Sequence, residues 1–106
     1  TQWVLDQKAS TLETVAPQVR VTANFDGSRL SGMGGCNNYS ASYSLDGSKM
    51  TIGPVAGTLI ACPPPANNVE AAYFERLPQV RSYAISGRTL TLTTSTKGAD
   101  LVYRRA

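Results

Sequence analysis

Residues 32–43 read Gly-Met-Gly-Gly-Cys-Asn-Asn-Tyr-Ser-Ala-Ser-Tyr and carry the most specific structural signal of the chain. The glycines at positions 32, 34 and 35 can adopt positive φ and allow close backbone approach, and Asn37 and Asn38 can hydrogen-bond to nearby main chain. An alternating strand pattern follows them. The pattern therefore predicts a tight bend around Cys36 that leads into a strand. A bend of this kind has a structural explanation and does not by itself indicate an enzyme.

A hairpin pattern occurs three times along the chain around this bend. It reads Phe25-Asp-Gly-Ser-Arg-Leu-Ser31, Leu45-Asp-Gly-Ser-Lys-Met-Thr51 and Ile85-Ser-Gly-Arg-Thr-Leu-Thr91. Asp-Gly is typical of a type I′ turn, which needs positive φ at both central residues. With two-residue loops centred on these dipeptides, the expected opposite pairs are Leu45 with Ser48, Tyr43 with Met50, and Tyr83 with Leu90. Three hairpins of one pattern predict a meandering antiparallel sheet.

The other elements follow from alternation, prolines and helical spacing. Strands are expected at residues 2–5, 18–25, 80–85, 88–94 and 100–104, with a loop at residues 6–17. Asn67 and Glu70 resemble a capping box ahead of apolar residues at helical spacing, and Pro78 blocks continuation. The sequence thus predicts one helix from Asn68 to Leu77. It follows an apolar run at residues 58–62 and three prolines that interrupt the sheet.

Length and composition bound the fold class. The 106 residues fit one domain, residues 1–106. Hydrophobic residues make up 42% of the chain and charged residues only 16%, against roughly 25% charged in typical soluble domains, which is common in β-rich secreted proteins. We expect a β-rich α+β fold, built as a curved antiparallel sheet or partly closed β-barrel of about 7–8 strands with one α-helix, and a monomer.

The net charge of +3 comes from scattered basic residues, so we expect no nucleic-acid partner. No apolar run is long enough for a transmembrane segment.

The residue types argue against most familiar active sites. The sequence has no histidine, which removes the usual base of serine and cysteine hydrolases and the commonest metal ligand. Its acidic residues are dispersed, two cysteines are too few for a structural zinc site, and the glycines at 32–35 precede a strand instead of a helix, unlike a phosphate-binding loop. We therefore predict no catalytic residue, no metal and no cofactor. The enzymatic alternatives are a paired-carboxylate glycosidase and a serine assisted by Lys8 or Lys49, although no motif singles out a serine. Trp3 and most of the five tyrosines fall in apolar-facing registers, which favours core packing over stacking against bases or sugars.

Four motifs together resemble the META domain, or HslJ-like, family. They are Gly35-Cys36-Asn37-Asn38-Tyr39, Tyr43-x-Leu-Asp-Gly-x-x-Met-Thr-Ile-Gly53, Thr58-Leu-Ile-Ala61-Cys62-Pro63 and Gly87-x-x-Leu-Thr-Leu. The resemblance extends from Trp3 to Arg104, and the Gly-Cys-Asn and Ala-Cys-Pro pair is specific in combination. One departure lies at residues 58–61, where the family often carries a Thr-Arg-Met-Ala type sequence. Any role of that arginine therefore does not transfer to this chain.

The resemblance implies a small β-rich domain with one helix. Such domains are often exported in bacteria, frequently as lipoproteins or as part of larger envelope proteins. Members are associated with heat shock and stress response, antibiotic tolerance and, in some parasites, virulence or secretion. The resemblance brings no catalytic residues, so the expected role of the motif residues is structural; they are Gly35, Cys36, Asn37, Asn38, Tyr39, Ala61, Cys62 and Pro63. We expect an extracytoplasmic chain (periplasmic, an outer-membrane lipoprotein, or secreted), with the signal segment not present in this sequence.

Cys36 and Cys62 are expected to form a disulfide. Each stands where a strand meets an irregular bend, and the composition fits an exported protein. A reduced buried pair is the alternative.

Two classes of function compete, with a third option beside them. The first is a non-enzymatic envelope domain with a stress-response, binding or structural role and an unknown envelope protein as its partner. The second is a small secreted protease inhibitor that presents the Cys62–Asn67 loop, which is stiff and would lose little entropy on binding; the candidate partner loop is Pro63, Pro64, Pro65, Ala66 and Asn67. The third is lipid or lipopeptide binding in an open barrel, which requires an interior left unfilled by Trp3, Phe25, Tyr43 and Leu92.

Overall fold

The computed structural model describes residues 2–106, which form nine strands, one α-helix and one short 3-10 helix. The strands are β1 (Gln2–Leu5), β2 (Thr22–Phe25), β3 (Arg29–Met33), β4 (Asn38–Asp46), β5 (Lys49–Ile52), β6 (Ala56–Gly57), β7 (Val80–Ser86), β8 (Thr89–Thr94) and β9 (Leu101–Arg105). The helices are α1 (Ala66–Arg76) and η1 (Leu77–Gln79).

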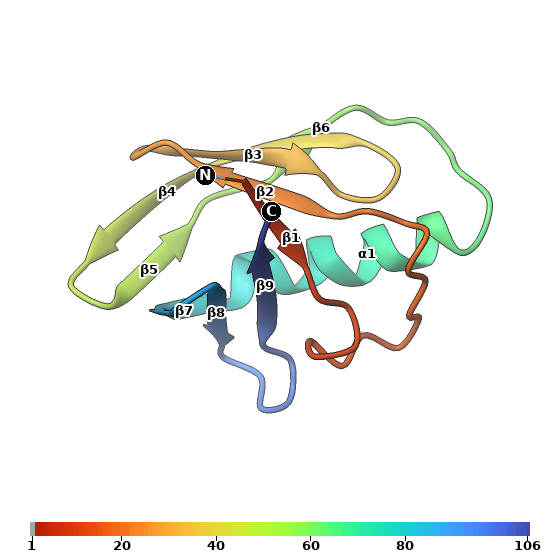
Figure 1. Ribbon diagram of the computed structural model, residues 1–106. Coiled ribbons are helices and arrows are strands. Elements are labelled where there is room, and N and C mark those ends of the chain that lie inside the picture. Colours follow the sequence, from red (N-terminus) through yellow and green to blue (C-terminus); the bar gives the residue numbers. More distant parts are fainter. Residues whose placement is uncertain (1) are drawn as a thin grey trace.

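Eight of these strands form a closed antiparallel barrel (Figure 1). Their order is β3-β2-β1-β9-β8-β7-β5-β4, and β4 pairs with β3 to complete the ring. Strand β6 adds to β4 outside this ring. The barrel has its fewest paired residues between β5 and β7. These strands are joined by the pair Lys49–Ser82 and by a hydrogen bond of 3.0 Å from the Tyr83 N–H to the Ser48 carbonyl. The predicted β-rich α+β fold with a single helix is confirmed, and the barrel is closed.

A chain of three tyrosines fills the centre of the core. Tyr73 of α1 is fully buried, and its hydroxyl lies 2.6 Å from that of Tyr39 and 2.9 Å from that of Tyr103. Tyr39 lies in β4 and Tyr103 in β9, on opposite sides of the ring. The Tyr39 hydroxyl donates to the Thr22 carbonyl at 2.8 Å, so each hydroxyl can donate to the next along the chain. The helix, which runs beneath β2 and β3 in Figure 1, thereby ties two opposite walls together through the interior.

The hairpins are confirmed as antiparallel pairs, but their registers differ from the prediction. Leu45 pairs with Met50 instead of Ser48, and Leu90 pairs with Ile85 instead of Tyr83. Each register is displaced by two residues, which keeps every side chain on its predicted face. The apolar alternation thus indicated the buried face correctly, while the exact partner depended on the turn.

The turns explain this displacement. Gly47 (φ 62°) and Gly87 (φ 60°) occupy the first position of each two-residue loop, which is the position that a type II′ turn assigns to glycine. A type I′ turn centred on Asp-Gly would also have placed the preceding residue at positive φ. In the hairpin at Asp26-Gly27, only the glycine has positive φ, so the type I′ prediction is wrong there as well.

Strand β2 is shorter than the predicted strand at residues 18–25. The Val19 N–H donates to the Ala16 carbonyl at 2.9 Å and closes a turn. The buried amide of Gln7 then donates to the Val19 carbonyl and accepts the Ala16 N–H, at 2.6 and 2.7 Å. This side chain satisfies backbone groups that a longer strand would have paired. The alternation at residues 18–21 therefore reflects burial of a loop.

The helix begins and is capped differently from the prediction. It starts at Ala66, its N-cap residue is Pro65, and no side chain caps it. The capping box predicted for Asn67 and Glu70 is therefore wrong. The carboxylate of Glu70 binds elsewhere.

Candidate functional site

The glycine-rich bend predicted around Cys36 is present and tightly packed. The Gly34 N–H donates to the Asn37 carbonyl at 2.8 Å, and Gly35 has a φ of 114°. A side chain at Gly34 would place its Cβ 2.6 Å from the ring of Phe74 in α1. A side chain at Gly34 would therefore displace the Phe74 ring, and one at Gly35 would be strained by the positive φ.

The Glu70 carboxylate holds this bend from the helix side. It accepts the backbone N–H groups of Cys36 and Asn37 at 2.8 and 2.5 Å and the side-chain amide of Asn37 at 2.7 Å. Glu70 is only 8% exposed, and the one ion pair within residues 2–106 joins two other residues. The bend thus solvates a buried carboxylate with three N–H donors, and the carboxylate in turn fixes the bend on α1.

Asn37 connects the bend to the chain that precedes the helix. Its amide nitrogen donates to the Ile60 carbonyl at 3.0 Å as well as to Glu70, and its amide oxygen accepts the Ile60 N–H at 2.7 Å and the Thr58 hydroxyl at 2.8 Å. All four hydrogen-bonding positions of the side chain are therefore filled. Asn37 links the bend, the helix and Ile60 at one point.

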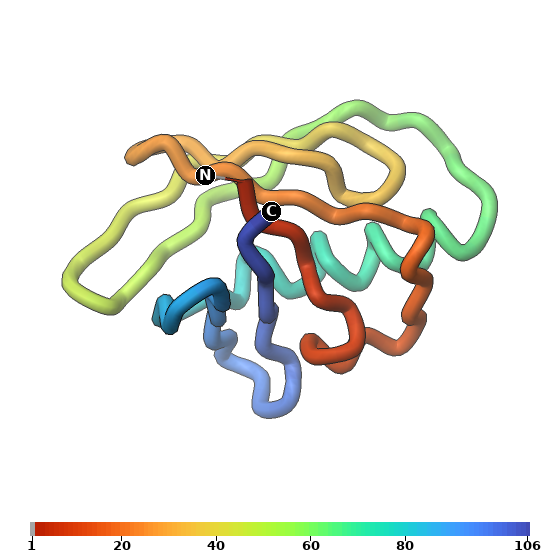
Figure 2. The backbone as a smooth tube through the Cα atoms, viewed as in Figure 1, coloured from red at the N-terminus to blue at the C-terminus, as the bar shows by residue number. Residues whose placement is uncertain are grey.

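The segment Thr58–Cys62, which we call the anchored segment, is fixed at both ends. The Thr58 N–H donates to the Asn38 carbonyl at 3.2 Å, and Cys62 forms the predicted disulfide with Cys36. Residues 58–63 form neither a helix, a strand, a turn nor a bend, so the segment is an irregular connection. Figure 2 shows this green stretch between β6 and α1 running along the outside of the fold.

Two large apolar side chains project from the anchored segment into solvent. Leu59 is 99% exposed and Ile60 is 64% exposed. Full burial of a leucine is worth about 1.5–3 kcal/mol, so the fold leaves that stabilisation unused at a position that it holds firmly.

The motif residues from the sequence come together around this segment. Gly35, Cys36 and Asn37 form the bend, Asn38 accepts the Thr58 N–H, Tyr39 enters the core, and Ala61, Cys62 and Pro63 continue the segment. Of the candidate partner loop, Ala66 and Asn67 belong to α1, so only its prolines are loop. Sequence reasoning missed Leu59, Ile60 and Glu70. The only signal for the first two was an apolar run bounded by a strand-ending glycine and three prolines.

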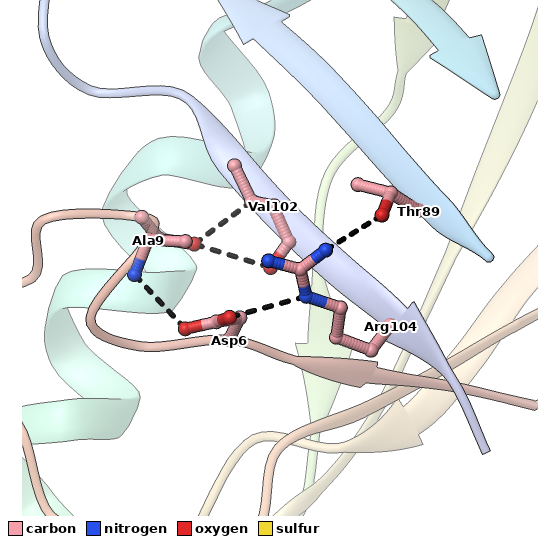
Figure 3. A network of polar contacts seen from close by, with 6 residues as sticks. Asp6, Ala9, Thr89, Val102 and Arg104 are labelled. Carbon is pink, nitrogen blue, oxygen red and sulfur yellow. Dashed lines mark hydrogen bonds and ion pairs between the residues drawn. The ribbon is translucent and has the colours of Figure 1, made fainter. Parts of the chain in front are cut away.

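A second polar cluster joins the first loop to β9 (Figure 3). Arg104 donates to the Asp6 carboxylate at 3.2 Å and to the Thr89 hydroxyl at 2.6 Å, and the Ala9 N–H donates to Asp6 at 2.9 Å. The Ala9 hydrogen bond lowers the pKa of Asp6, partial burial opposes this, and Arg104 adds to the lowering. Every polar group of the cluster has a structural partner. Residues 2–106 also contain no group of three His, Cys, Asp or Glu side chains placed to hold a metal.

Replacing Asn37 with alanine is expected to lower the free energy of unfolding by about 2 kcal/mol, because four hydrogen bonds at a partly buried site are lost. Asn37→Asp should cost about 1 kcal/mol more at neutral pH, since the introduced carboxylate cannot donate to Glu70 and repels it. Its penalty should shrink as the pH falls, because protonation of the introduced carboxyl group restores a donor toward Glu70.

Urea unfolding at several pH values measures both Asn37 variants. Asn38→Ala is the matched control, because the Asn38 side chain is exposed and only its backbone carbonyl is used. An Asn37→Asp protein as stable as the wild type at neutral pH would contradict this account of the site.

Comparison with known proteins places the chain among a family and two solved structures. The META domain family matches it over residues 1–106. An NMR structure of a protein from Burkholderia xenovorans superposes with a TM-score of 0.79 at 28% identity and covers 100% of this chain and 81% of that one. A second NMR structure gives a TM-score of 0.71 at 22% identity, covering 97% of this chain and 86% of the other, and shows the fold alone. No curated protein matches. Within the described residues, no helix is long and apolar enough to cross a membrane.

Proposed function

The chain belongs to the META domain family, and on that premise we propose that it is a non-enzymatic, extracytoplasmic module that binds a protein partner through the anchored segment. The stress-response role associated with the resemblance would then be exercised through this partner. The observation that carries the proposal is the 99% exposed Leu59 on a backbone held by Asn37 and a disulfide.

The energetics of the segment favour binding. Ordering a flexible loop opposes association, and a loop that is already ordered avoids this term. The anchored segment is tied to the bend by the disulfide and by hydrogen bonds from Thr58 and Ile60. A partner that covers Leu59 therefore gains most of the burial energy of a leucine without ordering the chain first.

The chemistry of the site supports a non-enzymatic role. The sequence contains no histidine. Glu70, the acidic residue closest to the bend, has its carboxylate oxygens engaged by three N–H donors. Asp26 likewise accepts the N–H groups of Arg29 and Ser28, and these hydrogen bonds lower its pKa. Both carboxylates are thus engaged in hydrogen bonds within the fold, as is expected of structural residues.

The extracytoplasmic location is supported by the Cys36–Cys62 disulfide, because disulfides persist mainly in oxidising compartments. The alternative of a lipid bound inside the barrel receives no comparable support. The interior that it requires is occupied by side chains that are 0% exposed, including Leu30, Leu92, Leu101, Tyr73 and Tyr103.

Affinity capture from the envelope and secreted fractions of the source organism tests this proposal. We expect the wild type to retain a partner that a Leu59→Ser, Ile60→Ser variant loses. The matched control is Leu45→Ser with Ile85→Ser, since these side chains are 50% and 55% exposed and lie on β4 and β7, away from the segment. Equal capture by all three proteins would contradict the proposed binding surface. Turnover of a substrate by the pure protein would contradict the non-enzymatic role.

A further inference from the structure

We propose, as a refinement that rests on the proposed function, that the partner is a serine endopeptidase with an apolar S1 pocket and that Leu59 is the side chain that enters this pocket. The anchored segment has the backbone, the side chain and the tethering that a slowly cleaved protease ligand requires.

The backbone of the anchored segment has one occupied edge and one free edge. The Thr58 N–H and both backbone groups of Ile60 are hydrogen-bonded toward the bend. The backbone N–H and C=O groups of Leu59 and Ala61, by contrast, have no hydrogen-bond partner within residues 2–106. In the proposed complex this stretch pairs as an extended chain, whose successive residues direct their backbone groups to alternate sides, and the groups of Leu59 and Ala61 are the ones left for the partner. An endopeptidase binds its substrate as an extended strand paired through such groups.

The side chain at the free edge fits an apolar pocket. Leu59 is the most exposed large apolar side chain of residues 2–106, at 99%, and its neighbours Thr58, Ile60 and Ala61 carry no charge. A hydrophobic S1 slot selects a large apolar residue and excludes charged ones. Three prolines follow Cys62, and the chain turns at Pro64 and Pro65 into α1.

The tethering on the other side of the Leu59–Ile60 bond would make cleavage unproductive. Attack of the protease serine on the Leu59 carbonyl carbon breaks the C–N bond, forms an ester on Leu59 and leaves a proton on the Ile60 amine. Ile60 is held by Asn37 through its carbonyl, and Cys62 is bonded to Cys36. The amine therefore stays beside the ester, attacks it, re-forms the peptide bond and returns its proton to the enzyme's base. Water has little access to the ester in the meantime.

A second copy of this chain is the competing occupant of the free edge, because an uncharged, exposed stretch of backbone with unpaired groups can pair with its own kind. The two occupants make different demands on Leu59. A second copy would pair with the backbone of the segment, whereas a protease would recognise the side chain of Leu59. The experiment therefore substitutes Leu59.

Inhibition constants for chymotrypsin, subtilisin and trypsin test the inference. We expect the wild type to inhibit chymotrypsin or subtilisin and not trypsin. Leu59→Arg should weaken that inhibition at least about 100-fold and create inhibition of trypsin, whose S1 pocket carries an aspartate. Leu45→Arg is the control and should change neither constant. Asn37→Ala should convert the protein into a substrate cleaved between Leu59 and Ile60.

Three results would overturn the inference. They are no inhibition of chymotrypsin or subtilisin by the wild type at micromolar concentration, rapid cleavage of the wild type at Leu59, and a dimer by light scattering that Leu59→Ser dissociates. The first two leave the proposed function standing if the capture experiment still identifies a Leu59-dependent partner that is not a protease.

Discussion

Raising the pH above about 10 is expected to unfold the protein steeply, because three tyrosines in its core would have to ionise. Burial raises the pKa of Tyr39, Tyr73 and Tyr103 above the ordinary value of 10.0. The hydroxyls form one hydrogen-bonded chain that ends at the Thr22 carbonyl. Loss of a proton would leave a charge in the centre of the barrel with no cation beside it among the hydrogen-bond partners.

The sign of the effect follows from proton linkage. Below pH 10 the three phenols are protonated in both the folded and the unfolded state, so they contribute no pH dependence to the free energy of unfolding. Above pH 10 the unfolded chain releases protons that the folded protein keeps. Each retained proton lowers the free energy of unfolding by about 1.4 kcal/mol per pH unit, so three lower it by about 4 kcal/mol per pH unit.

Chemical denaturation between neutral and strongly alkaline pH, followed by Trp3 fluorescence and circular dichroism, measures this slope. Tyr73→Phe should be less stable at neutral pH and should show a slope smaller by about 1.4 kcal/mol per pH unit, since one titrating group is gone. The protein has five tyrosines. Formation of more than two phenolates while the circular dichroism stays native would mean that a core tyrosine ionises in the folded state, contrary to the prediction.

Removal of the disulfide is expected to lower the free energy of unfolding by about 3.5 kcal/mol in the chain-entropy model. Cys36 and Cys62 are separated by 26 positions, and cross-linking them restricts the unfolded chain. A domain of this size has a total stability of about 5–15 kcal/mol, so the loss is a large fraction. Thermal and urea unfolding of the Cys36→Ser, Cys62→Ser variant measures it.

Reduction of the wild type provides the control for this variant. The reduced protein and the double serine variant should have the same stability within error, because both lack the cross-link. Intact mass should rise by two hydrogens on reduction of the native protein. A double variant as stable as the oxidised wild type would show that the anchored segment does not depend on the covalent link.

The sequence predicted the elements that have a strong periodic signal. The strand at residues 2–5 and the helix around Val69 and Tyr73 have apolar residues at spacings that only one conformation can bury together. The disulfide was predictable because the chain has two cysteines and a composition typical of exported proteins. In each case, a local pattern and the global fold favour the same structure.

The hairpin registers required information that alternation does not contain. A shift of two residues preserves the buried face, so Leu45 and Ile85 could be placed on a face but not opposite a partner. The turns determine the register, because Gly47 and Gly87 occupy the loop position at which their neighbours need no positive φ. The prediction had assumed the commoner turn centred on Asp-Gly.

The candidate site was the least predictable part of the molecule. Glu70 follows Asn67 at capping-box spacing, yet it binds a bend 33 and 34 positions earlier in the chain. That contact depends on the tertiary placement of α1. Leu59 and Ile60 read as an apolar run, and nothing local distinguishes a run that is buried from one that Asn37 holds in solvent. Asn37 itself was predicted to serve the bend, which is one half of its role.

The proposed binding mode requires that the anchored segment is already fixed in the free protein, with Leu59 exposed on an ordered backbone. Backbone ¹⁵N relaxation of the free protein measures this order. We expect order parameters of about 0.85 for the amides of Leu59, Ile60 and Ala61, equal to those of the barrel strands; values below about 0.6 at these three amides would contradict the proposal.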